Sequence, residues 1–162
     1  MNRITLCPEG PHVSAFSFGC MRLKDDPKGT GTDRIEEKIN FCLERGITTF
    51  DHADLYGNYE CEEIFGRALK TNPSLRDKME IVSKCGIQLI DANRPTTKVK
   101  HYDYSKKYIT DSVERSLQSL GTDYIDILLF HRPSPLMNMD EIAEATQQLQ
   151  SDGKVRFFGV SN

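Results

Sequence analysis

Short apolar runs alternate with segments of helical periodicity along most of this chain, and the alternation leaves few folds open to it. The apolar runs cover residues 15–19, 48–51, 79–83, 124–130 and 155–160. Between the runs, apolar residues recur at helical spacing, as with Ile35, Ile39, Cys42 and Leu43. Strict alternation of this kind predicts parallel strands joined by right-handed crossovers. We therefore expect five strands and four helices in a regular β-α order.

Several residue types indicate where the helices begin and end. Asp33, with Glu36 three residues later, predicts a capping box for the first helix, and Gly46 is typical of the position after a helix end. Ser105 is suited to cap the third helix. The long polar connection 86–103 has the length of a binding loop or lid, but the sequence does not decide between these and a plain linker.

The parallel sheet could close in two ways: as an open doubly wound sheet, or as the first five strands of a (β/α)8 barrel. A doubly wound nucleotide fold would carry a glycine-rich phosphate motif after its first strand, and the sequence has none. Residues 3–6 and 12–14 flank a Pro-Glu-Gly-Pro turn, which predicts a hairpin ahead of the series. We expect an α/β fold, a (β/α)8 TIM barrel. Residues 1–162 would be the N-terminal part of its single domain, with strands six to eight absent.

Composition excludes several classes of partner. The net charge of −3 gives no basic surface for nucleic acid or anionic membrane, so a small soluble ligand is expected. The five cysteines form no C-x-x-C pair, which argues against a disulfide framework or a zinc site. There is no apolar run of about 18 residues and no signal peptide pattern. A cytoplasmic protein is the resulting prediction.

Chemically active side chains follow three of the apolar runs. Asp51 ends the second run and Tyr56 follows it, Lys84 follows the third run, and His131 follows the fourth. The carboxyl ends of parallel strands share one edge, where ligands bind and catalytic groups lie. Each residue alone has an ordinary structural explanation, such as a turn acid or a core histidine. Their joint occurrence predicts a catalytic site.

Four segments together resemble the aldo-keto reductases, most closely the bacterial oxidoreductases with His-Arg-Pro after the fourth strand. They are Asp-His-Ala-Asp-Leu-Tyr-Gly at 51–57, Ser-Lys at 83–84, Leu-Leu-Phe-His-Arg-Pro at 128–133, and Gly-Lys-Val-Arg-Phe-Phe-Gly-Val-Ser-Asn at 153–162. The resemblance implies a (β/α)8 barrel that reduces aldehydes and ketones with NADPH. It makes Tyr56 the proton donor, with Lys84 and Asp51 behind it and His131 beside it.

The same resemblance implies the cofactor site. Ser161 and Asn162 match the pair that hydrogen-bonds the nicotinamide carboxamide, and Gly19, Cys20 and Met21 correspond to the first-strand loop near cofactor and substrate. A preference for NADP over NAD is implied by the resemblance alone. Considered singly, Cys20 is expected to pack as a small apolar residue.

The four residues suit this chemistry on physical grounds. Hydride addition to a carbonyl builds negative charge on oxygen, so a positioned acid must deliver a proton as that charge forms. A free phenol, with a pKa of about 10, is a poor donor at neutral pH unless its anion is stabilised. A lysine ammonium can stabilise that anion, and a carboxylate such as Asp51 keeps the lysine charged. Neutral His131 can orient the carbonyl, and no metal is required.

Two other functions stay open at this point. The chain could be a catalytically inactive or truncated relative that serves as a binding or regulatory protein, or an unrelated barrel isomerase or lyase that uses Lys84 as a Schiff-base amine. The expected partner is a small carbonyl compound, without nucleic acid or membrane. If the polypeptide is only this long, exposed strand edges would allow self-association or pairing with a separate second half. His12, His52 and His101 are expected to be structural or solvent-facing.

Overall fold

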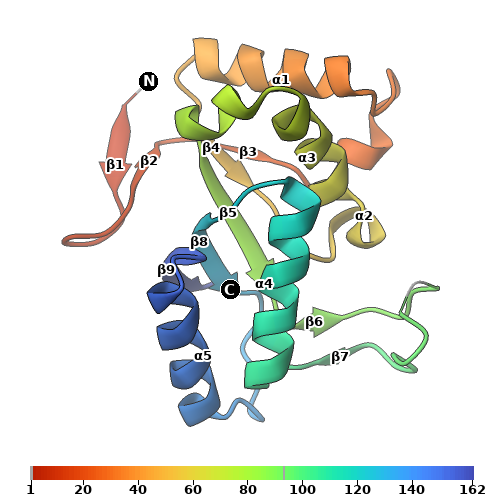
Figure 1. Ribbon diagram of the computed structural model, residues 1–162, viewed down its shortest axis with the longest axis vertical. Coiled ribbons are helices and arrows are strands. Elements are labelled where there is room, and N and C mark those ends of the chain that lie inside the picture. Colours follow the sequence, from red (N-terminus) through yellow and green to blue (C-terminus); the bar gives the residue numbers. More distant parts are fainter. Residues whose placement is uncertain (1, 93) are drawn as a thin grey trace.

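The centre of the molecule is a five-stranded parallel sheet (Figure 1). The computed structural model describes residues 2–92 and 94–162. The strands lie in the order β3 (Ser17–Gly19), β4 (Thr49–Asp51), β5 (Glu80–Cys85), β8 (Ile125–Phe130) and β9 (Val155–Val160). This order follows the chain without reversal, whereas a doubly wound sheet reverses at its switch point. The sheet is therefore part of a (β/α)8 barrel wall, as the sequence predicts.

Helices connect the strands and pack beside one another in chain order. The long ones are α1 (Thr32–Glu44), α3 (Cys61–Thr71), α4 (Lys106–Leu120) and α5 (Met139–Ser151). Helix α3 contacts both α1 and α4, and α4 contacts α5, in a row that Figure 1 shows from α1 at the top to α5 at the bottom. Shorter turns are η1 (Leu23–Asp25), α2 (Tyr56–Tyr59) and η2 (Pro73–Lys78). Within the described ranges, no helix has the length and apolarity to cross a membrane.

The helix ends agree with the sequence predictions in all but one case. The Ser105 hydroxyl accepts from the Tyr108 backbone N–H at the start of α4. Gly46 follows the end of α1 with a φ of 72°, in the left-handed region that glycine adopts without strain. The predicted capping box is wrong, because α1 begins at Thr32 with Gly31 as its N-cap and no side-chain cap. Asp33 therefore lies inside the first turn.

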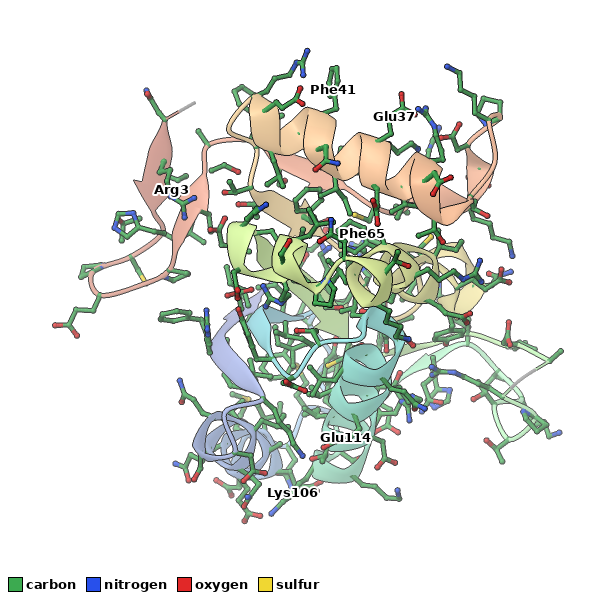
Figure 2. The ribbon with its side chains drawn as sticks, turned by 45° about the horizontal axis from the view of Figure 1, so that its top comes forward. Arg3, Glu37, Phe41, Phe65, Lys106 and Glu114 are labelled. Carbon is green, nitrogen blue, oxygen red and sulfur yellow. The ribbon has the colours of Figure 1, made fainter. Side chains whose placement is uncertain are left out.

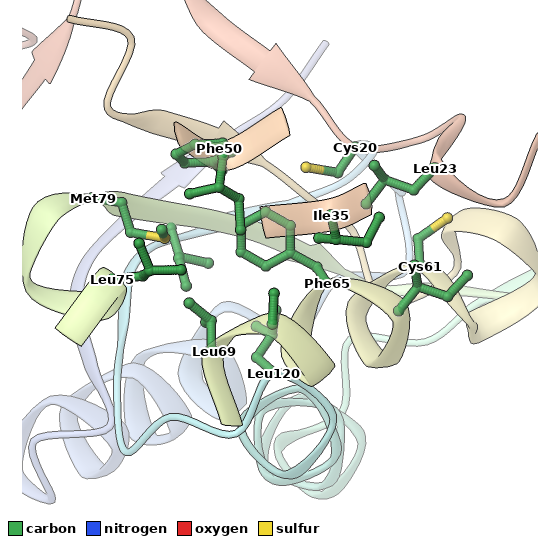
Figure 3. Packing of buried hydrophobic residues seen from close by; sticks show 14 of the residues in the cluster. Cys20, Leu23, Ile35, Phe50, Cys61, Phe65, Leu69, Leu75, Met79 and Leu120 are labelled. Carbon is green, nitrogen blue, oxygen red and sulfur yellow. The ribbon is translucent and has the colours of Figure 1, made fainter. Parts of the chain in front are cut away.

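The larger core fills the space between the sheet and the helices α1 and α3. Phe50 of β4 and Phe65 of α3 are both fully buried, with ring centroids 5.2 Å apart. Figure 3 shows Phe65 among the labelled side chains of α1, α3 and the end of α4. In Figure 2, Glu37 and Phe41 of α1 point away from this interior. A second core under α4 and α5 includes Ile109, Leu128 and Leu149.

The N-terminal hairpin packs against the sheet face that the helices leave uncovered. Strand β1 (Arg3–Thr5) pairs antiparallel with β2 (His12–Ser14), which confirms the predicted hairpin. Val13 packs with Val82 and Ile127 on that face. The Arg3 guanidinium pairs with Glu80 at 2.7 Å, so the hairpin is tied to the amino ends of the strands.

Asp126 is a buried carboxylate within the apolar strand β8. Its Oδ2 accepts from Arg76 Nη2 at 2.6 Å and from the Ile81 backbone N–H at 2.9 Å. Its Oδ1 accepts from Arg156 at 3.0 Å. The charge is thus fully paired, and it links η2 to three neighbouring strands.

The connection after β5 contains a small antiparallel hairpin that the sequence did not predict. Strands β6 (Ile87–Gln88) and β7 (His101–Tyr102) form it, and the Leu89 backbone N–H donates to Tyr59 Oη at 2.8 Å. The Tyr59 ring in turn lies under the Arg94 guanidinium, 3.5 Å from the ring centroid. Residues 86–92 and 94–103 of the long polar connection therefore form a structured wall at the carboxyl edge of the sheet.

Candidate active site

The carboxyl edge of the sheet brings together the four side chains that the sequence predicts to be catalytic. Asp51 is the last residue of β4, Tyr56 begins α2, and His131 directly follows β8. Lys84 was expected after its strand but lies inside it. Strand β5 continues to Cys85, because Lys84 and Cys85 still pair with the end of β8.

The Lys84 ammonium is the centre of the arrangement. The lysine is 6% exposed, and its Nζ donates to Asp51 Oδ1 at 2.6 Å, to the His52 carbonyl at 2.9 Å and to Tyr56 Oη at 3.0 Å. An ammonium has three donors and no acceptor. All three donors are therefore used, and Tyr56 Oη must be the acceptor in its pair.

The imidazole of His131 lies across from the tyrosine ring. The ring centroids of Tyr56 and His131 are 6.0 Å apart and the planes are nearly perpendicular, at 82°. Burial, helped by the charges of Lys84 and Arg132, lowers the pKa of His131 to about 4. The imidazole is therefore neutral at pH 7 and keeps one ring N–H for donation.

These groups open onto a cleft of about 1020 Å³. Leu55 and Asn58 line it near the tyrosine, and the hairpin adds Leu89 and Tyr102. Leu55 belongs to the 51–57 segment that carries the family resemblance. The other three were not singled out from the sequence, because a contact made by a loop leaves no periodic pattern. Cationic side chains also line the cleft, and they are Arg22, Lys24, Lys100 and Arg132. Of these, Arg132 had a sequence signal, since it follows His131 directly.

The structure separates the five residues predicted for cofactor binding. Ser161 and Asn162 lie on the cleft, and Asn162 Nδ2 donates to the His131 carbonyl at 3.3 Å. Met21 also lines the cleft, with 52% of its surface exposed. Gly19 and Cys20 are not among the lining residues. Cys20 is fully buried in the core, and its backbone N–H and carbonyl are bonded to Asp51 and Leu23, so the structure does not open it to the cleft.

A model described as the aldo/keto reductase family matches residues 15–162. The chain belongs to the aldo/keto reductase family. This confirms the family resemblance drawn from the sequence. The match includes every strand of the barrel wall and all four residues around the cleft.

Individual relatives agree with this membership. The chain is 48% identical over 162 residues to the oxidoreductase YdhF of Escherichia coli K12, and 45% identical over 162 residues to the 6-dehydroglucose reductase of Agrobacterium fabrum C58. These alignments cover 100% of this chain. They cover 53% of the first relative and 54% of the second. A solved aldo-keto reductase, AKR11C1 from Bacillus halodurans in its holo form, superposes with a TM-score of 0.82. It is 33% identical, over 99% of this chain and 50% of that one. The chain thus spans about half the length of the relatives it matches.

This aldo/keto reductase chain buries two carboxyl groups behind β5. Glu62 Oε1 accepts from Ser83 Oγ at 2.6 Å, and Asp54 Oδ2 accepts from Ser112 Oγ at 2.8 Å. Burial, together with the charge of Asp54, raises the pKa of Glu62 to about 7. Burial likewise raises the pKa of Asp54 to about 6. The pair therefore titrates close to neutral pH, which the sequence did not reveal.

His52 was expected to be either structural or solvent-facing, and the structure shows that it is structural. Its ring is fully buried and packs edge-on against Phe65, with centroids 4.6 Å apart. Burial, with the nearby Lys84 charge, lowers the pKa of His52 to about 3. The ring is neutral at pH 7, and the residue serves the site through its backbone carbonyl.

Proposed function

We propose that this protein is an NADPH-dependent oxidoreductase that reduces aldehydes or ketones to alcohols, with Tyr56 as the general acid. The observation that carries the proposal is the Lys84 ammonium with all three of its protons committed. Two of these hydrogen bonds hold the lysine, to Asp51 and the His52 carbonyl, and the third reaches the Tyr56 hydroxyl. This arrangement is suited to a phenol that gives up its proton.

The direction of that hydrogen bond sets the path of the proton. Because Lys84 can only donate, Tyr56 Oη accepts from it, and the tyrosine's own O–H is left for another acceptor. The cleft is the open side of this oxygen, since Tyr56 and Lys84 both line it. A substrate carbonyl there would receive the proton as negative charge forms on its oxygen. The ammonium would then stabilise the phenolate left behind.

Neutral His131 supplies a second donor to the same oxygen. The histidine lies beside Tyr56 on the cleft and keeps a ring N–H at pH 7, because its pKa is lowered to about 4. Two hydrogen-bond donors directed at one point of the cleft would bind a carbonyl oxygen there in preference to an apolar group. We assign His131 the role of orienting the carbonyl.

The hydride must come from a cofactor, and the cleft offers residues that fit one. A bound nicotinamide nucleotide would supply the hydride. Ser161 and Asn162 present a hydroxyl and an amide at the cleft edge beside His131, the donors and acceptors that a carboxamide needs. Met21 also lines the cleft and can contact a bound ring. The choice of NADPH over NADH rests on the family resemblance.

The relatives guide the choice of substrate and of domain boundaries. Since one relative is named a 6-dehydroglucose reductase, 6-dehydroglucose is the first physiological compound to assay. We also propose that residues 1–162 form the N-terminal part of one barrel domain, a proposal that the half coverage of its relatives supports.

The test is NADPH oxidation with 4-nitrobenzaldehyde, comparing the native protein with Tyr56→Phe. Loss of a general acid is expected to lower kcat by roughly 10²- to 10⁴-fold. Tyr124→Phe is the matched control, because Tyr124 lies before β8, at the opposite end of that strand from His131, and stacks against Arg76. Equal rates for native protein and Tyr56→Phe would remove the tyrosine from the mechanism. No turnover by the native protein, with weak or absent NADPH binding in a calorimetric titration, would favour a binding or regulatory protein instead.

The hydrogen bonds of Lys84 argue against the alternative in which this lysine forms a Schiff base. An amine attacks a carbonyl through a lone pair, and Lys84 would have to break its bonds to Asp51 and Tyr56 to expose one. Borohydride trapping in the presence of substrate checks this directly. A covalent adduct at Lys84 would instead support the isomerase or lyase function.

A further inference from the structure

Tyr104 makes an unusual contact with the segment that carries His131. Its hydroxyl accepts from the Arg132 backbone N–H at 3.0 Å and donates to the Arg132 backbone carbonyl. One hydroxyl thus satisfies both backbone polar groups of Arg132. It can do so because a hydroxyl has one proton to donate and lone pairs to accept. Tyr104 is 5% exposed and lies just before α4, so it ties this helix to the exit of β8.

The fold provides a fitted place for the Tyr104 ring. Gly86 has a φ of 110°, a conformation that other residues rarely adopt. A Cβ at Gly86 would lie 2.0 Å from the nearest ring atom of Tyr104. The ring also meets Phe130 edge-on, with centroids 5.8 Å apart. The ring therefore packs against both the exit of β5 and the end of β8.

Those two exits carry the lysine and the histidine of the site. Lys84 precedes Gly86 by two residues, and His131 directly precedes Arg132. The His131 backbone N–H donates to the Cys85 carbonyl at 3.0 Å, which joins the exits on the side next to the sheet. Tyr104 joins them again on the helix side. With both ties in place, the backbone on either side of the imidazole is held.

We propose that Tyr104 is a positioning residue for His131, which sets where the imidazole stands relative to the Tyr56 hydroxyl and the substrate carbonyl. The inference rests on the proposed reductase function. Tyr104 lines no part of the cleft, so it acts through the Arg132 peptide and not by touching substrate. A displacement of about 1 Å at a catalytic group can lower a rate by about 10²-fold. A hydroxyl outside the cleft can therefore matter to the chemistry.

The experiment compares Tyr104→Phe with Tyr124→Phe and native protein. The first substitution removes only the hydroxyl that contacts Arg132. The second removes a hydroxyl that makes no hydrogen bond within residues 2–92 and 94–162. We expect Tyr104→Phe to lower kcat by 10- to 100-fold, with the KM for NADPH changed less than twofold. The His131 ring resonances in ¹⁵N-¹H spectra should shift in Tyr104→Phe and stay in place in Tyr124→Phe. A purely structural hydroxyl would lower stability and leave these resonances unchanged.

Two further variants make the outcome decisive. Tyr56→Phe tests the proposed function in the same assay: if it keeps full activity, the reductase mechanism fails. If Tyr56→Phe is inactive and Tyr104→Phe has native kcat and native His131 resonances, the positioning role alone is overturned. Should Tyr104→Phe not fold, para-aminophenylalanine at position 104 replaces it, because its amine can still donate to the Arg132 carbonyl but accepts poorly. Native kcat and unshifted His131 resonances in that variant would likewise overturn the inference.

Discussion

Replacing Glu62 by glutamine should reduce the loss of stability that we expect of the native protein between pH 5 and pH 8. Glu62 is 4% exposed and shares its buried surroundings with Asp54. Its pKa is raised from 4.5 to about 7, so folding disfavours its ionised form. For an acid with a raised pKa, the stabilising contribution is complete below the unfolded pKa and is lost as the pH rises through the folded one. The glutamine variant cannot ionise at this position and should not suffer that loss.

The expected magnitude follows from the shift. A difference of about 2.5 pKa units, at about 1.4 kcal/mol per unit, corresponds to roughly 3 kcal/mol. Most of this falls between pH 5 and pH 8, because the unfolded carboxyl is already largely ionised at pH 5 and the buried one only above pH 7. The amide oxygen of glutamine can still accept from Ser83 Oγ, which now donates to Glu62 at 2.6 Å. The substitution therefore removes the charge and keeps the contact.

The assay is urea unfolding of native protein, Glu62→Gln and Glu63→Gln at pH 5 and pH 8. Glu63 is the next residue, with 58% of its side chain exposed, and its contact with Arg67 lies on the surface. The fall in unfolding free energy from pH 5 to pH 8 should be about 2 to 3 kcal/mol smaller in Glu62→Gln than in the other two proteins. Equal falls in all three would show that Glu62 does not titrate in the folded state near neutrality, and would refute the reasoning.

Three further predictions concern the histidine, the buried ion pair and the helix contact. An NMR titration of His131 should give a midpoint near pH 4, with the neutral ring present above it; a midpoint above pH 6 would contradict a buried imidazole beside Lys84. Arg76→Met should lower the unfolding free energy by about 3 to 5 kcal/mol, because it leaves the buried Asp126 carboxylate without its main partner. Adding Asp126→Asn should restore part of that loss, and a Met variant as stable as native protein would mean that the pair is not buried. Gly66→Ala should lower stability by about 2 to 3 kcal/mol, since its Cβ would lie 2.0 Å from the Ser119 carbonyl oxygen. Gly31→Ala, which meets nothing within 4 Å, is the control in the same urea experiment.

The strands and helices could be predicted from the local pattern of apolar and capping residues, because each element is specified by its own residues. The apolar run at 124–130 became β8, and Ser105 capped α4. The capping box failed for an equally local reason. Asp33 and Glu36 have the right spacing, but the helix starts at Thr32, and sequence patterns place helix ends less well than helices themselves.

The candidate site was predictable as a group of residues but not as a geometry. Strand topology alone brings Asp51, Lys84 and His131 to one edge. The interactions that define the chemistry join residues distant in sequence, and no local pattern records them. The contact of Tyr104 with Arg132 and the pairing of Glu62 with Ser83 are of this kind.

The Lys84 ammonium, held by three acceptors, also determines how this amine meets reagents. Acylating agents consume a free amine, so lysines at the surface should be modified long before a nitrogen enclosed in this way. Slow modification of Lys84 would then require a transient separation from β5 of the end of β4, which carries Asp51, and the start of α2, which carries Tyr56. The rate of labelling at this one lysine, read by mass spectrometry, would measure how often these contacts at the carboxyl edge of the sheet open.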